Sequence, residues 1–177
     1  GVLTAHRLGR SQAGGLTYDI HGDLTRMTLD SLIDKQSVLA SLKAPNKKQL
    51  LQELSHALAT QVAIDHRVIF ETLLKREKLG STGIGQGIAI PHGKLPSISR
   101  VYGLFARLAQ PVDFDSVDGQ PVDLVFVLLA PEDAGADHLK ALAKISRLLR
   151  DPAMVAKLRG TDGRNIATGA TAEDDSS

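Results

Sequence analysis

The chain has 177 residues, which is enough for one domain with a substantial buried core and too short for two ordinary domains. Its 21 Lys and Arg residues nearly balance its 20 Asp and Glu residues, and aromatic residues make up only 3%, so a nucleic-acid-binding surface is not expected. Cysteine is absent, which excludes disulfides, thiol catalysis and thiolate metal sites and is typical of a protein of the reducing cytoplasm.

The two ends of the chain are poor in core residues. Residues 1–26 contain five glycines and no sustained apolar period, and they predict a flexible arm or an added extension, with Met27 as a plausible true start. Residues 161–177 end in an acidic stretch and predict a solvated, disordered tail. The domain is therefore expected over residues 27–160. No secretory signal or membrane-spanning run is present, so we expect a soluble, cytoplasmic protein that does not insert into a membrane.

Two helices are predicted in the first half of this domain. Asn46 is a good N-cap, and the apolar residues after it recur at helical spacing: Leu50, Leu51, Leu54, Ala57 and Leu58. A second helix is predicted from Asp65 to about Lys78, ended by Gly80, with an inward face made of Val68, Ile69, Leu73 and Leu74. Both helices should pack against a common core.

Three short apolar segments then predict strands at residues 87–91, 101–109 and 122–131. The last is apolar at nearly every position, so it should be central and covered on both faces. A third helix is predicted from an N-cap at Asp137 to about Arg150, and a short fourth helix from Pro152; the inward face of the third would be Leu139, Leu142, Ile145 and Leu149. Helices before and after a group of strands predict an α/β fold, a three-layer α/β/α sandwich around a mixed β-sheet.

The glycine-rich segment from Lys75 to Lys94 carries the strongest chemical signal. It lacks the Lys and Ser or Thr of a nucleotide-binding P-loop, and it leads into a strand where a dinucleotide fingerprint would open a helix. Its glycines expose backbone N–H groups that suit an oxyanion such as a phosphoryl group, although a simple helix-to-strand turn is also compatible with the spacing.

His92 directly follows the predicted strand ending in Pro91. Proline holds Ile90 in extended geometry, so the histidine is expected to leave the sheet in a defined direction. Neutral imidazole is a competent nucleophile near pH 7 and can both accept and pass on a phosphoryl group. From the residue alone, an ordinary surface histidine in a turn remains the alternative.

The run REKLGSTGIGQGIAIPHGK at residues 76–94 resembles the active-site signature of the A components of the fructose, mannitol and nitrogen-regulatory phosphotransferase systems, and is most similar to the nitrogen-regulatory form. Two further stretches share this similarity, FDSVDGQPVDLVFVLLAPED at 114–133 and HLKALAKISRLLRD at 138–151. The resemblance covers most of residues 27–159. The sequence departs from it after Arg159, where the further amphipathic helix of the family is not apparent.

The resemblance implies specific roles for these residues. His92 would be phosphorylated by the phosphohistidine of an HPr-type carrier protein, and Arg76 and His138 would support it. Phosphoryl transfer depends on positioning and charge stabilisation, to which a guanidinium and a second imidazole in the first turn of a helix are suited. Ser81, Thr82 and Gly83 are candidate phosphate-binding residues, with turn formation as the equally simple explanation of both hydroxyl residues.

The expected partners are the HPr-type carrier as donor and regulatory target proteins, and no cofactor or metal is expected. The alternative is an A component of a fructose- or mannitol-type sugar uptake system that passes phosphate to a B domain. A pure binding module remains open, whereas a serine hydrolase is disfavoured because no G-x-S-x-G elbow occurs. His6, His21, His56 and His66 have scattered spacing and do not predict a zinc site.

Overall fold

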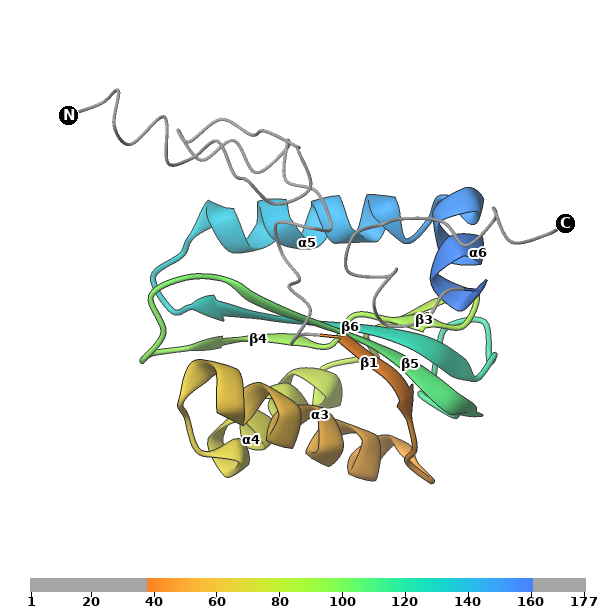
Figure 1. Ribbon diagram of the computed structural model, residues 1–177. Coiled ribbons are helices and arrows are strands. Elements are labelled where there is room, and N and C mark those ends of the chain that lie inside the picture. Colours follow the sequence, from red (N-terminus) through yellow and green to blue (C-terminus); the bar gives the residue numbers. More distant parts are fainter. Residues whose placement is uncertain (1–37, 161–177) are drawn as a thin grey trace, which may run out of the picture.

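A mixed β-sheet with two helices on each face forms the body of the protein (Figure 1). The computed structural model describes residues 38–160, so the segments expected at 1–26 and 161–177, and the start of the domain at residue 27, lie outside the described residues. Helices α3 (Lys47–Val62) and α4 (His66–Lys78) cover one face, and α5 (Ala136–Leu148) and α6 (Pro152–Gly160) cover the other. The predicted three-layer α/β/α sandwich is confirmed.

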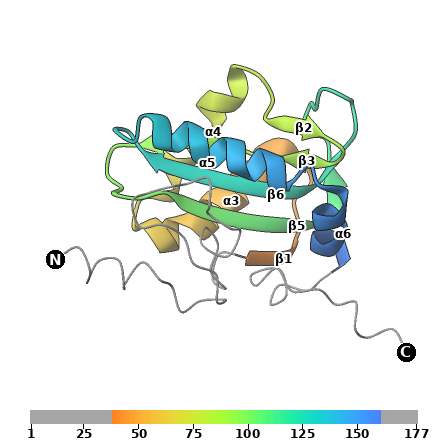
Figure 2. The same ribbon diagram turned by 90° about the horizontal axis from the view of Figure 1, so that it is seen from above.

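Within residues 38–160, six strands form the sheet, in the order β1-β5-β6-β3-β2 with β4 also paired to β6. Their bounds are β1 (Val38–Leu42), β2 (Gly83–Gly85), β3 (Ile88–Ala89), β4 (His92–Leu95), β5 (Tyr102–Val112) and β6 (Val122–Pro131). β6 pairs antiparallel with β5 and parallel with both β3 and β4. Figure 2 shows β1 and β2 at opposite edges of the sheet.

Strand β6 supplies both halves of the core. Val125, Val127 and Leu129 pack with the residues of α3 and α4, whereas Leu124, Phe126 and Leu128 pack with those of α5 and α6. All six are fully buried, as expected for a strand whose alternating side chains each meet a layer of helices. The prediction that this segment is central is therefore confirmed.

Two of the three predicted N-caps are confirmed, and the fourth predicted helix begins at Pro152 as expected. The Asn46 side chain accepts a hydrogen bond from the Gln49 amide at 2.9 Å, and Asp65 caps α4 through the Arg67 amide at 2.9 Å. The predicted cap at Asp137 is wrong. Gly135, at φ 59°, occupies the N-cap of α5 without a side-chain bond, and Asp137 lies inside the first turn.

Two predicted inward residues and one predicted strand also differ from the structure. Val68 is 45% exposed and Leu139 is 65% exposed, because the buried stripes of their helices run through the adjacent positions Ile69 and His138. The single strand expected at residues 87–91 is divided. Its first part is β3, and β4 begins at His92; both parts keep the same register along β6, and the Pro91 carbonyl between them accepts a hydrogen bond from the Leu128 amide at 3.0 Å.

A clamp from the last helix holds the turn between β2 and β3. The Arg159 guanidinium donates to both Asp123 carboxylate oxygens, with its shortest contact at 2.8 Å, and to the Gln86 carbonyl at 2.7 Å. Gly87 sits inside this clamp with φ +81°, and a Cβ there would lie 2.6 Å from Arg159 Nη2 and 2.8 Å from Asp123 Oδ1.

We expect Gly87→Ala to destabilise the fold more than Gly119→Ala, measured by urea denaturation. Both glycines have positive φ, so each substitution carries a backbone strain of about 1–2 kcal/mol. Only Gly87 also has close neighbours, since a Cβ at Gly119 meets nothing within 4 Å, and displacing the clamp should add roughly 1–3 kcal/mol. Equal losses of stability in the two variants would show that Arg159 and Asp123 move aside without measurable cost.

Candidate functional site

His92 is the first residue of β4, which pairs in parallel with β6. Its Cα is in register with Leu128 of β6, and the ring is half-buried. The Nδ1 atom lies 2.8 Å from the Ile90 carbonyl oxygen. A carbonyl can only accept a hydrogen bond, so Nδ1 of the neutral ring carries the proton and Nε2 keeps its lone pair. The ring is thus both oriented and prepared as a nucleophile through Nε2.

His138 lies next to His92. The two ring centroids are 5.6 Å apart, and the ring planes are inclined by 44°. His138 occupies the first turn of α5 and is buried, and its Nδ1 makes no hydrogen bond within residues 38–160. A buried polar atom is ordinarily paired, so His138 has a hydrogen-bonding position that the described residues leave unused.

Arg76 reaches the site from the last turn of α4. Helix α4 packs closely on β4, because a Cβ on Gly93 would lie only 2.6 Å from the Thr72 methyl carbon. Arg76 is one helical turn beyond Thr72 on the same face, and its charge acts on His92. Its Nη1 donates to the Gly80 carbonyl at 2.8 Å, so the guanidinium also holds the start of the glycine-rich loop.

Both histidines favour the neutral form. Burial lowers the pKa of His92; the Ile90 hydrogen bond opposes this, the Arg76 charge adds to it, and the Glu77 charge opposes it. Burial likewise lowers the pKa of His138, and the charges of His92 and Lys94 lower it further. With pKa values below the ordinary 6.5, both rings are mainly neutral at pH 7.

The predicted phosphate-binding residues Ser81, Thr82 and Gly83 make hydrogen bonds within the protein. Ser81 Oγ donates to the Phe114 carbonyl at 2.6 Å and accepts from the Gly83 amide at 3.0 Å. The buried Thr82 hydroxyl donates to Glu77. The structure therefore places His138 against His92 and Arg76 near enough for its charge to act on His92, whereas the two hydroxyl groups and the Gly83 amide serve to shape the loop.

Sequence reasoning missed Glu77 and its partner Lys47. Glu77 falls one helical turn after the buried Leu73, and its side chain is only 2% exposed. A charged residue on the inward stripe of an amphipathic helix was the available signal, since such a residue is rarely buried without a partner. Lys47 Nζ lies 3.1 Å from Glu77 Oε1.

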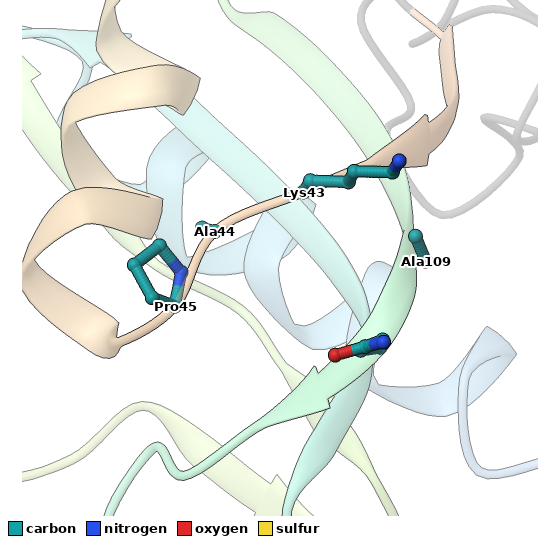
Figure 3. Close-up of a pocket in the computed structure, with 5 residues that line it drawn as sticks. Lys43, Ala44, Pro45 and Ala109 are labelled. Carbon is teal, nitrogen blue, oxygen red and sulfur yellow. The ribbon is translucent and has the colours of Figure 1, made fainter.

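Other features lie apart from this site. A cavity of about 380 Å³ is lined by Lys43, Ala44, Pro45, Ala109 and Gln110 (Figure 3). Gly103 and His92 both pair with Leu128, so Ala109, further along β5, is roughly 20 Å from the site. Within residues 38–160, no three His, Asp or Glu side chains converge as metal ligands would, and no helix there is long and apolar enough to cross a membrane.

Comparison with known proteins identifies the family of the chain. Residues 31–166 match the family model of the phosphoenolpyruvate-dependent sugar phosphotransferase system, EIIA 2. The nitrogen regulatory protein of Bradyrhizobium diazoefficiens is 57% identical over 135 residues, which cover 76% of this chain and 88% of that protein. The nitrogen regulatory protein of Escherichia coli is 41% identical over 136 residues, covering 76% and 83%.

A solved structure shares the fold. The nitrogen regulatory protein IIA-Ntr from Neisseria meningitidis superposes with a TM-score of 0.76 at 34% sequence identity, covering 80% of this chain and 97% of that one. The match of the family model to most of the chain, together with these relatives, shows that the chain belongs to the EIIA 2 family of the phosphotransferase system, and within it resembles the nitrogen regulatory proteins.

Proposed function

We propose that His92 accepts a phosphoryl group from the phosphohistidine of an HPr-type carrier protein, and that partner proteins bind this chain differently in its two phosphorylation states. The observation that carries the proposal is the neutral His92 ring, tied through Nδ1 to the Ile90 carbonyl, with the free buried Nδ1 of His138 beside it. Family membership supports a phosphocarrier role. Because such a carrier donor is cytoplasmic, we place the chain in the cytoplasm.

The transfer step balances without a cofactor or metal. The Nε2 lone pair of His92 forms a new N–P bond while the N–P bond of the donor phosphohistidine breaks, and the donor imidazole leaves with that bonding pair. The Nδ1 proton stays on His92, where the Ile90 carbonyl stabilises the positive ring that results. No separate general base is required.

The surrounding residues would stabilise the charge of the phosphoryl oxygens. Arg76 supplies a permanent positive charge, and His138 supplies a hydrogen-bonding nitrogen at the start of α5, where the helix dipole favours an anion. Ser81, Thr82 and Gly83 would contribute by fixing the main chain of the loop around the phosphoryl group. Phosphorylation thus adds a group of about two negative charges to a ring that was neutral, which is a large local change for any protein docking there.

We expect a single acid-labile, alkali-stable phosphoryl group per chain when the carrier and its upstream enzyme are supplied, measured by intact mass. His92→Ala should abolish the label because it removes the nucleophile. His56→Ala is the matched control, since His56 is exposed and stacks on His66 away from the site. Undiminished labelling of the His92→Ala protein would refute the assignment.

The rate of phosphoryl acceptance should be nearly constant above pH 6.5 and fall at lower pH, because protonation of His92 blocks Nε2. The lowered pKa of His92 places the acid limb below the ordinary value of 6.5. Stability should follow the same direction: a histidine with a depressed folded-state pKa lets the unfolded state bind protons first, so stability is lost as the pH falls below about 6.5. An NMR titration of His92 with its midpoint above 6.5 would contradict both expectations.

The regulatory role is tested against the alternative of a sugar-uptake component. Labelled phosphoprotein is mixed with cell extract, and the label is followed together with the proteins that bind. Stable phosphoprotein that captures different partners from the unphosphorylated form is the expected result, because the docking surface has changed charge. Rapid transfer of the label to a cysteine of a sugar-specific B protein would instead identify a transport component.

A further inference from the structure

The Glu77 carboxylate is a buried charge to which the proposed transfer step assigns no role. It accepts a hydrogen bond from the Thr82 amide at 3.0 Å through Oε1 and another from the Thr82 hydroxyl through Oε2. Thr82 lies in the glycine-rich loop, directly before β2. Glu77 therefore ties the end of α4 to the first residues of that loop.

A single lysine balances this carboxylate. Lys47 opens α3, and its Nζ contacts Glu77 Oε1 at 3.1 Å and donates to the Phe114 carbonyl at 3.3 Å. The same ammonium group lies 4.5 Å from the centroid of the Phe114 ring and 3.7 Å from Asp115, which is largely exposed. The close and buried partner is Glu77, because contacts with exposed carboxylates contribute little.

A continuous series of hydrogen bonds joins this ion pair to His92. Thr82, held by Glu77, accepts at its backbone carbonyl the amide hydrogen of Ile90, at 3.0 Å. The Ile90 carbonyl in turn accepts the Nδ1 hydrogen of His92 at 2.8 Å. Each bond fixes the group that makes the next one, so a displacement of Glu77 would reach the His92 ring.

We propose that Lys47 and Glu77 are a positioning pair for His92: Glu77 orients the ring through Thr82 and Ile90, and Lys47 cancels the Glu77 charge that would otherwise oppose a phosphoryl group. Only one part of this inference rests on the proposed function, namely that Lys47 cancels a charge that would oppose a phosphoryl group. The orientation and charge of the unphosphorylated ring can be measured directly. Neither residue touches the reacting atoms in this arrangement.

The charges around His92 determine how its pKa should change in each variant. Arg76 and Glu77 of α4 act on His92 with opposite sign, and His138 of α5 and Lys94 of β4 complete the titratable groups around the two rings. Removing the Lys47 charge leaves Glu77 uncompensated, which favours a protonated His92. Removing the Glu77 charge has the opposite effect.

The experiment is a double-mutant cycle with Lys47→Met, Glu77→Gln and the double variant, read by NMR titration of His92 in the unphosphorylated full chain. We expect the His92 midpoint to rise by roughly half a pH unit in Lys47→Met and to fall by a similar amount in Glu77→Gln. The double variant should return close to wild type, because glutamine keeps an oxygen that can accept from Thr82. Lys48→Met, which removes an exposed lysine one position along α3, should leave the midpoint unchanged.

The rate of phosphoryl acceptance is the second measurement. Lys47→Met should slow acceptance by roughly 10-fold or more, because a His92 ring that is misplaced, or that lies beside an uncompensated negative charge, reacts more slowly. Lys47→Arg, which keeps the positive charge, should retain most of the wild-type rate. If the titration midpoints of both single variants equal that of the wild type, the positioning pair is refuted even where labelling of His92 succeeds. If the wild-type chain takes no phosphoryl group, the proposed function fails while the titration still tests the pair.

Discussion

The pairing of β6 with three other strands is the constraint on which the rest of the molecule depends. β6 is buried on both faces, so its alternating side chains serve two cores, and its backbone pairs with β5 on one side and with β3 and β4 on the other. The position of His92 follows from the last of these pairings. Because Leu128 is fixed inside the core, its pairing partner His92 in β4 is fixed as well, and the half-exposed ring is attached to a rigid backbone.

The site combines two imidazoles that are mainly neutral at pH 7 with charges held close to them. Burial keeps both imidazoles mainly neutral at pH 7, while Arg76 and the buried Lys47–Glu77 pair place fixed charges nearby. An uncompensated buried carboxylate would be costly, and it would repel an incoming anion. Under the proposed function this arrangement meets two needs at once: a strong hydrogen-bond acceptor holds the loop, and the same region accommodates added negative charge.

The glycine-rich segment illustrates how a local pattern acquires its meaning from the fold. Its spacing was compatible with a plain turn, and in part it is one, since β2 and β3 form a short hairpin that Arg159 and Asp123 clamp from outside. The hydroxyl groups of Ser81 and Thr82 are engaged within the protein. The segment therefore contributes an ordered main chain beside His92, held by side chains from α4, β6 and α6.

The sequence alone determined the layer architecture, the central strand, the caps at Asn46 and Asp65, and the family, because these depend on periodicity, local side-chain bonds and a long motif. It did not determine which residues of α4 and α5 face inward at Val68 and Leu139, the start of α5 at Gly135, or the continuation of the strand expected at residues 87–91 into β4. Those features depend on which parts of the fold each helix and strand packs against. The Lys47–Glu77 pair has the same origin: the two residues are far apart in the chain, and only the packing of α3 against α4 turns two ordinary charged residues into one buried ion pair beside the glycine-rich loop.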